Sequence, residues 1–330
     1  MRNLSILGSA LLTWLACVGA PAWSAQKQDD AARFPNRPVR IVIPFAPGGM
    51  PDITARLISV KLTEALGQQV IVDNRTGAGG SIGSRIVSES TPDGHTLLAT
   101  SASHVLAPSV RASLPYDTVK DFAGITRTTT ACYLLVAAPA LGVTTVKDFI
   151  ALAKAKPGQL NFASAGTGSG THFAGEMLKH RAAIDVVHVP YKGIPDALND
   201  TIAGRVQFFM APLITAAPLA KDGKVRALGV SAEKRVAAHP DIPTLAEAGL
   251  PGFRFDSWSG MLAPARTPRA IIDKLNREVA RALALADITQ RLTALGAEPA
   301  PMSPAAFDKL IVEEIAVAAK LARQAGIKPE

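Results

Sequence analysis

One stretch of the chain combines the residue types of a phosphate loop with those of a hydrolase. Ala163–His172 reads ASAGTGSGTH, with Ser169 between glycines and His172 three positions later. A serine and a histidine can form a nucleophile and its base. Glycines can instead bring backbone N–H groups close to a bound anion. The stretch is therefore either part of an active site or a cradle for a ligand.

Motif spacing argues against catalysis. A P-loop would have Gly and Lys where Thr171 and His172 stand, and a nucleophile elbow would have glycines in place of Thr167 and Thr171. The segment GAGGSIG (Gly77–Gly83) misses the dinucleotide fingerprint because its last glycine comes one position late. The 6 histidines show no metal-binding spacing. We therefore expect a protein that is not an enzyme, with no catalytic residue, metal or cofactor.

Each of two glycine-rich loops lies between a strand and a helix. VRIVIPF (Val39–Phe45) is typical of a buried strand and leads through APGGMPD to a helical pattern at Ile53–Leu66. Leu160–Ser164 is a second such strand, followed by the loop and a helix at Thr171–His180. Ligands of open α/β sheets bind at the carboxyl ends of the strands, where the N-termini of helices favour anions. Two such loops in different lobes would form a two-sided clamp for an anion.

Strand-like and helix-like segments alternate along much of the chain. Further strands are expected at Gln69–Asp73, His95–Ser103, Tyr133–Ala138, Val186–Val189 and Val206–Met210, and further helices at Ile82–Ser90, Val146–Lys154, Pro195–Ala203, Pro268–Leu285 and Pro304–Ala325. This alternation predicts parallel sheets with helices on their faces. A chain of 330 residues is long enough for two lobes, each with its own core.

The N-terminus has the pattern of a secretory signal. Arg2 precedes an apolar run at Leu4–Val18, and the small residues of APAWSA follow. This order predicts a signal peptide at residues 1–25. The apolar run is too short to span a bilayer comfortably. We therefore expect export to the periplasm, with cleavage after Ala22, Ser24 or Ala25.

The two cysteines bear on the same question. Lipid anchoring at Cys17 is an alternative to ordinary cleavage, although Trp14 stands where a lipoprotein signal has leucine. In either case Cys132 is left without a partner in the exported chain. Stability must then come from packing and not from a disulfide framework.

The composition excludes some classes of partner. The net charge is +8, but no run of five basic residues occurs and aromatic residues make up only 5% of the chain. Nucleic-acid binding would require a basic stripe or stacking rings, so we expect none. The positive balance favours the approach of small anions. No second apolar stretch is long enough to cross a membrane, and we expect a soluble monomer.

Four residues have two interpretations each. His172 lies in the first turn after the glycine loop and could face a ligand or be structural. Asp52 could stabilise the N-terminus of its helix or line a pocket and select a donor group. Lys192 could pair with an anion or lie in solvent, and Trp258 could be a core aromatic or the floor of a cleft.

Taken together, the motifs resemble the Bug family, extracytoplasmic solute receptors of the tripartite tricarboxylate transporter type. The motifs are PFAPGGMPDITARLISVKL, QVIVDNRTGAGGSIG, PDGHTLL, LPYDTVKDF, KPGQLNFASAGTGSGTHFAGEML, HVPYKG, DIPTLAEAG, APARTP and AGIKPE. They occur in the family's order, and the resemblance runs from about Phe34 to the last residue.

The resemblance implies an α/β, two-lobe periplasmic-binding-protein (flytrap) fold. Each lobe would be a mainly parallel sheet with flanking helices, and crossover strands would form the hinge. Residues 33–130 would begin lobe 1, residues 131–228 would form lobe 2, and residues 229–330 would return to lobe 1 and add the C-terminal helices. The implied function is capture of a small organic carboxylate, or a related acid or amide, for a membrane permease of a tripartite tricarboxylate-type transporter.

The resemblance also implies which residues bind the ligand. They are Phe45, Gly48, Gly49, Asp52, Ser101, Ser103, Ala165, Gly166, Thr167, Gly168, Ser169 and His172. Ala211 and Pro212 stand where the family usually has an acidic or amide residue, which favours a less polar acid. A ligand sensor for a signalling partner and an exported Ser/His hydrolase remain the alternatives.

Overall fold

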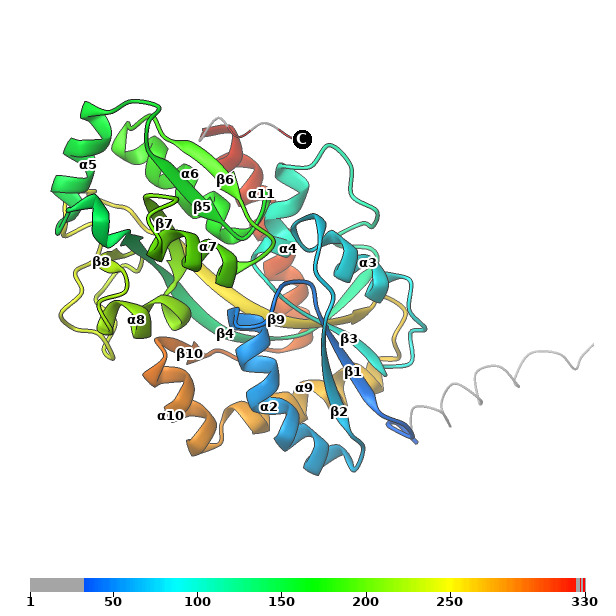
Figure 1. The fold of residues 1–330 in the computed structure, drawn as a ribbon. Coiled ribbons are helices and arrows are strands. Elements are labelled where there is room, and N and C mark those ends of the chain that lie inside the picture. The colour runs from blue at the N-terminus through cyan, green and yellow to red at the C-terminus, as the bar shows by residue number, and fades with distance from the viewer. Residues whose placement is uncertain (1–32, 325–326, 328, 330) are drawn as a thin grey trace, which may run out of the picture.

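The structure, a computed structural model, describes residues 33–324, 327 and 329. The signal peptide expected at residues 1–25 and the alternative lipid anchor at Cys17 lie outside the described residues. The chain folds into two α/β lobes that share one curled sheet with the strand order β2-β1-β3-β9-β4-β7-β5-β6 (Figure 1). The two-lobe α/β fold predicted from the sequence is therefore confirmed.

In the first lobe, three parallel strands carry helices on both faces. The strands are β1 (Val39–Ile43), β2 (Val70–Asn74) and β3 (Thr96–Ser101). One face packs on α2 (Met50–Leu66), α9 (Arg269–Leu283) and α10 (Ala286–Ala294), and the other on α3 (Ser81–Ser88), α4 (Ser103–Leu106) and α11 (Pro304–Gln324). Successive side chains of a strand point to opposite faces. Ile41 accordingly joins the first cluster and Val42 the second.

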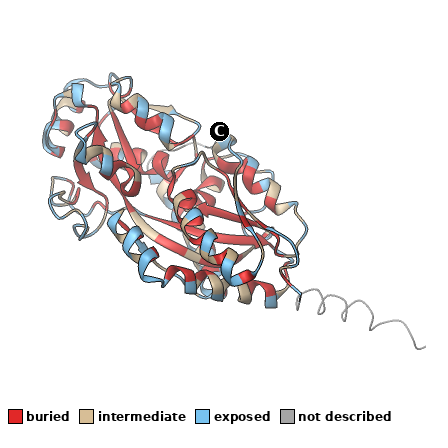
Figure 2. Cartoon of the chain, turned by 60° about the horizontal axis from the view of Figure 1, so that its bottom comes forward, coloured by how far each residue is buried: buried red, intermediate tan, exposed pale blue. Residues whose placement is uncertain are grey.

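The second lobe repeats this plan. Its parallel strands are β5 (Asn161–Ser164), β6 (Val187–Pro190) and β7 (Phe208–Pro212). Helices α5 (Val146–Ala155) and α6 (Gly170–Ala182) cover one face, and α7 (Ile194–Ile202) and α8 (Leu213–Lys221) cover the other. Figure 2 shows buried residues concentrated in the strands of both lobes and on the inner faces of the helices.

Two long antiparallel strands connect the lobes. Residues 122–132 of β4 (Phe122–Ala137) pair with β9 (Asp256–Pro264) and so belong to the first lobe. Residues 133–137 of the same strand pair with β7 and with β8 (Arg226–Val230) in the second lobe. The short β10 (Ala297–Pro299) also pairs with β4. One 16-residue strand therefore runs from one lobe into the other.

The structure corrects several expected boundaries. The strand expected at Tyr133–Ala138 is only the end of β4, and Ala211 and Pro212 lie within β7 instead of after it. Strands β8, β9 and β10 and helices α4, α8 and α10 were not expected. The lobe boundaries stay predictions. Leu245 and Phe253 pack in the core of the second lobe, which favours a return to the first lobe near β9 instead of at residue 229.

Candidate functional site

A cavity lies between the lobes, where the glycine loops after β1 and β5 meet the connecting strands. Its volume is about 40 Å³, enough for one or a few water molecules. The lining residues are Phe45, Ala46, Gly49, Met50, Pro51, Ser101, Ala131, Cys132, Tyr133, Ala165, Ser169, Gly170, Thr171, Ile194, Pro212 and Ser257. None of these lining residues is a lysine, an arginine, a histidine, an aspartate or a glutamate.

The first loop leads from β1 into α2. Gly48 has a φ of +90°, a conformation that residues with a side chain rarely adopt. Gly49 is the N-cap of α2, and Pro51 occupies the first turn, where its lack of an N–H has no cost. The backbone N–H groups at the start of a helix have no partner within the helix. Gly49 and Met50 line the cavity, with the positive end of the helix dipole behind them, so their amides are the donors that this loop can offer there.

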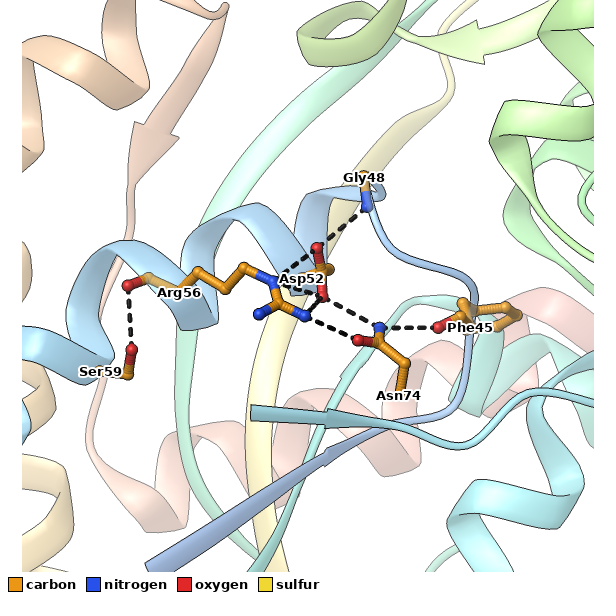
Figure 3. A network of polar contacts seen from close by, with 6 residues as sticks. All are labelled: Phe45, Gly48, Asp52, Arg56, Ser59 and Asn74. Carbon is orange, nitrogen blue, oxygen red and sulfur yellow. Dashed lines mark hydrogen bonds and ion pairs between the residues drawn. The ribbon is translucent and has the colours of Figure 1, made fainter. Parts of the chain in front are cut away.

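Asp52 braces this first loop from behind. Its carboxylate accepts hydrogen bonds from the Gly48 amide at 3.0 Å, from Arg56 Nε at 3.1 and 3.2 Å, and from Asn74 Nδ2 at 3.0 Å. Asn74 Nδ2 also donates to the Phe45 carbonyl at 3.0 Å. Figure 3 shows these contacts converging on the carboxylate, with the ring of Phe45 directed away from it. The two ends of the loop are thus tied to one side chain.

The network keeps Asp52 ionised. Burial raises the pKa of Asp52, but hydrogen bonds from Arg56, Gly48 and Asn74 outweigh burial and hold the pKa below its ordinary value of 3.8. Asp52 is 3% exposed and does not line the cavity. Of its two interpretations, the structure favours support of the helix N-terminus and its loop over selection of a donor group.

The second loop leads from β5 into α6, and most of its polar groups bond within the loop. Ser169 is the N-cap of α6, with Oγ accepting from the His172 amide at 3.2 Å and lying 2.9 Å from Thr171 Oγ1. The amides of Ala165 and Ser169 donate to Thr171 Oγ1 and to the Gly166 carbonyl. The amides of Gly170 and Thr171 begin the helix and line the cavity. These two N–H groups are the donors that this loop offers to an anion.

His172 faces this loop and not the cavity. Its Nδ1 accepts a hydrogen bond from the Gly168 amide at 3.3 Å, and its Nε2 lies 4.0 Å from Glu176 Oε1. Burial, with a smaller contribution from Lys179, lowers the pKa of His172 from 6.5 to about 4. A base for Ser169 would need a ring nitrogen directed at Oγ, and Nδ1 is already occupied by Gly168.

The connecting strands contribute residues that sequence reasoning missed. Tyr133, Cys132 and Ser257 line the cavity from β4 and β9. Burial, slightly opposed by a hydrogen bond with Ser257, raises the pKa of Tyr133 to about 12, and burial raises that of Cys132 to about 12. A β-carbon at Gly170 would stand 2.1 Å from the Tyr133 hydroxyl, so this hydroxyl lies directly on the N-terminus of α6. No local motif indicates these residues, because long-range pairing of β4 with β7 and β9 brings them to the cavity.

The two lobes touch around the cavity. Arg111 Nη2 of the first lobe lies 3.4 Å from the Thr167 carbonyl of the second. A β-carbon added at Gly193 would stand 2.6 Å from Ala46 Cβ, and one at Gly79 would stand 2.4 Å from the Thr167 carbonyl oxygen. The cleft is therefore closed in this structure, and little room is left between the lobes.

The predicted binding residues fall into two groups. Phe45, Gly49, Ser101, Ala165 and Ser169 line the cavity. Gly48, Asp52, Ser103, Gly166, Thr167, Gly168 and His172 are not among the lining residues; Ser103 bonds to the lining residue Ser101, with 2.8 Å between their Oγ atoms, and Thr167 contacts Arg111 of the first lobe. A direct contact of these seven with a ligand stays a prediction.

Two other residues follow the simpler of their interpretations. Lys192 is exposed and does not line the cavity. Trp258 is 4% exposed in the core formed with Phe307, and its Nε1 donates to Glu314 at 2.6 Å. Within the described part of the chain, no cluster of three or more His, Cys, Asp or Glu residues could hold a metal, and no helix there is long and apolar enough to cross a membrane.

Comparison with known proteins identifies the family. The sequence profile described as "Tripartite tricarboxylate transporter family receptor" matches residues 54–327. The chain belongs to this family. The protein BugT of Bordetella pertussis is 33% identical over 329 residues, which cover 99% of this chain and 98% of BugT. The resemblance to the Bug receptors stated from the sequence is thus confirmed.

Two solved structures from Rhodopseudomonas palustris share the receptor fold. One, described as Rpa4515 with adipate, has a TM-score of 0.87 and 35% identity and covers 90% of this chain and 100% of its own. The other, MatC (Rpa3494) with bound malate, has a TM-score of 0.83 and 36% identity and covers 87% of this chain and 99% of its own. The acids named in the two descriptions, adipate and malate, are both small dicarboxylic acids.

Proposed function

We propose that this receptor captures a small organic carboxylate between its lobes in the periplasm and presents it to the permease of a tripartite tricarboxylate-type transporter. The observation that carries the proposal is the placement of two helix N-termini, those of α2 and α6, at one interlobe cavity. Each offers backbone N–H groups and a positive dipole end to an anion. The adipate and malate bound by the two related receptors support the same class of ligand.

The chemistry of the lining refines the class of ligand. The carboxylate would accept hydrogen bonds from the amides of Gly49, Met50, Gly170 and Thr171, and charge neutralisation would come from helix dipoles because none of the lining residues carries a positive charge. Hydrogen bonds to a charged partner contribute about 1.5–3 kcal/mol each. After the costs of association and closure, micromolar affinity is reasonable.

The other wall of the cavity is largely apolar. It includes Phe45, Ile194 and Pro212. Pro212 belongs to the pair Ala211–Pro212, which stands where the resembled family usually has an acidic or amide residue. This wall favours an acid with an apolar body over one with several hydroxyl or amino groups. The two lobes touch around the cavity, so entry of such an acid requires the lobes to move apart and close again around the ligand.

The same geometry supports binding without chemistry. Ser169 Oγ caps α6, and His172 Nδ1 is directed at the Gly168 amide, so the two side chains do not form a nucleophile and base. We therefore expect the wild-type protein to hydrolyse neither esters nor amides. If it does hydrolyse such substrates and Ser169→Ala abolishes that activity, the hydrolase alternative is supported instead.

A thermal-shift screen of the purified protein tests the proposal. The panel contains mono-, di- and tricarboxylates, aromatic acids and amino acids. A ligand at 100 times its Kd stabilises a folded protein by about 2.7 kcal/mol, so a true ligand gives a clear shift. We expect the largest shift from a carboxylate with an apolar body. A folded, ligand-free protein that no acid stabilises would contradict the proposal.

A further inference from the structure

Two stacked histidines lie beneath the second glycine loop. The rings of His172, on α6, and His188, on β6, have centroids 4.1 Å apart and planes inclined by 23°. On its other side His188 stacks on Phe162, with centroids 4.9 Å apart. Neither histidine lines the cavity. The pair must therefore act on the site, if at all, through the loop above it.

Each ring is connected to one backbone amide of that loop. The Gly168 amide donates to His172 Nδ1 at 3.3 Å. The Gly166 amide donates to Ser164 Oγ at 3.0 Å, and this hydroxyl lies 2.6 Å from His188 Nε2. Gly166 and Gly168 have φ values of +112° and +84°. The two amides thus point away from the cavity, in a backbone conformation that needs glycine.

The contacts fix the protonation of His172. A neutral imidazole has one nitrogen that donates and one that accepts. Because Gly168 donates to Nδ1, the ring proton lies on Nε2, on the side of Glu176 Oε1 at 4.0 Å. A second proton on Nδ1 would set two N–H groups against each other and remove the support of the Gly168 amide.

We propose that His172 and His188 are positioning residues whose neutral rings hold the Gly168 and Gly166 amides inward, so that the Gly170 and Thr171 amides are left to face the ligand. The inference rests on the proposed function for the identity of the ligand, but the bracing of the loop does not depend on it. The proposal gives His188, which lies outside the loop motif, a role at the site. It gives His172 the role of supporting the loop in place of direct contact with a ligand.

The surroundings disfavour charge on either ring. Lys179 on α6 and Arg111, which contacts the Thr167 carbonyl, are the nearby cations, and Glu176 is the nearby carboxyl group. Burial raises the pKa of Glu176, which weakens its ability to offset a charged histidine. Burial, together with His172 and Lys179, lowers the pKa of His188 to about 3. The two rings are therefore neutral where the loop is intact.

The first experiment needs no ligand and no variant. Nitrogen-15 NMR of the ligand-free protein reports which ring nitrogen of each histidine carries the proton. We expect His172 as the Nε2–H tautomer and His188 with an unprotonated Nε2 that accepts from Ser164. A proton on Nδ1 of His172 would overturn the proposal, because that nitrogen could not accept from Gly168.

The second experiment measures hydrogen exchange of the Gly168 and Gly166 amides in matched variants. In His172→Asn the amide oxygen can replace Nδ1, and in His188→Gln it can replace Nε2, whereas His172→Leu and His188→Leu keep the volume and lose the acceptor. One hydrogen bond corresponds to roughly tenfold in exchange rate. We expect about tenfold faster exchange of the Gly168 amide in His172→Leu and a smaller increase for the Gly166 amide in His188→Leu, where Ser164 Oγ remains its acceptor. Each amide variant should exchange at near wild-type rates.

His180 offers a control on the same helix. It is exposed at the far end of α6, so His180→Asn removes a titratable histidine without touching the loop. We expect its Gly168 exchange to match the wild type. Provided that the variants fold, two outcomes would contradict the proposal. One is unchanged amide exchange in both leucine variants, and the other is a change in the His180 control as large as that in the leucine variants.

The third experiment relates the brace to binding. It measures the affinity of each variant for the acid that stabilises the wild type most in the carboxylate panel. We expect roughly tenfold weaker binding in the leucine variants and recovery in the amide variants. If the panel yields no ligand, the proposed function fails while the exchange data still decide the role of the histidines. If a ligand is found and leucine variants bind it normally with altered exchange, the positioning role is wrong.

Discussion

The two loops at the cavity have the same outline and are held by different chemistry. The first, Phe45–Asp52, is tied back by a carboxylate in an ionic network with Arg56 and Asn74, and the Arg56 side chain is 50% exposed. The second, Ala165–His172, is tied back by a helix cap and by two neutral, stacked histidines. A strand, a glycine turn and a helix N-terminus set the shape of an anion-binding loop. The side chains that hold the loop in place decide whether acid or salt weakens it.

Acid should have the largest effect, because it should weaken the second loop at a higher pH than the first. The lowered pKa of His172 means that the unfolded chain takes up a proton near pH 6.5, whereas the folded protein does so only near pH 4. The stability tied to neutral His172 is therefore complete above pH 6.5 and is lost as the pH falls toward 4. A change from 6.5 to about 4 corresponds to on the order of 3 kcal/mol.

Chemical denaturation across this pH range checks the effect. We expect the free energy of unfolding to fall less steeply with acid in His172→Asn than in the wild type. Asp52 behaves differently, because its lowered pKa makes its contribution persist down to about pH 3.8 and disappear only below that value. Equal pH slopes for the wild type and His172→Asn would remove the distinction between the loops.

Removing the carboxylate should damage the first loop without affecting the second. Asp52→Ala leaves the Gly48 amide without its acceptor and removes one of the two acceptors of Asn74 Nδ2, and charged hydrogen bonds of this kind suggest a loss of about 2–3 kcal/mol in unfolding free energy. We also expect carboxylate affinity to fall at least roughly tenfold. Urea titration and calorimetry measure the two effects.

Asp73→Ala provides the matched control for this change. Asp73 is an ion-paired aspartate on the neighbouring strand, bonded to Arg40 and Arg75 and not to the loop. Its loss should lower stability modestly and leave affinity unchanged. A similar loss of affinity in both variants would show that Asp52 has no special role at the loop.

The loops could be predicted from the sequence because their signals are local. An apolar run, a glycine turn and a helix pattern appear in order at Val39–Leu66 and again at Leu160–His180. The structure has a strand, a turn and a helix at both places. The direction of a side chain within such a loop is not a local property. The roles of Asp52 and His172 therefore stayed open until their partners Asn74 and Gly168 were placed.

The connecting strands were harder to predict for a related reason. TRTTTA at Thr126–Ala131 is polar and lacks the apolar pattern of a core strand, although Thr126, Thr128 and Thr129 are buried in the structure. Tyr133 and Ser257 reach the cavity through strand pairings with Pro212 and Ala131, partners that lie 79 and 126 residues away in the chain. Such contacts leave no spacing signal in a single sequence.

Closure can be tested separately from either brace. Gly193 faces Ala46 across the cleft, and an added β-carbon would stand 2.6 Å from Ala46 Cβ. The φ of Gly193 is −177°, which any residue can adopt, so the clash acts on closure and not on the backbone. Overpacking of this kind costs about 1–3 kcal/mol, and we expect Gly193→Ala to weaken carboxylate binding roughly tenfold.

The double variant Gly193→Ala/Ala46→Gly restores the space and should recover the affinity. Small-angle scattering with saturating ligand should show a more open Gly193→Ala and a normal double variant. Failure of Ala46→Gly to rescue binding would mean that the clash is relieved within one lobe, and that closure does not depend on this contact.

The smallest effect concerns Arg56, the exposed member of the first network. Because half of its side chain is in solvent, Arg56→Gln should lower the unfolding free energy by less than about 1 kcal/mol, and salt should reduce the difference further. Arg85→Gln, which removes an exposed pair with Glu89, is the matched control and should show almost no effect. A loss at Arg56 that exceeds the control at low salt and disappears at high salt would show that the first loop is held partly by a screened charge. A loss that does not respond to salt would mean that the hydrogen bond from Arg56 Nη2 to Asn74 Oδ1, at 2.8 Å, carries the contribution.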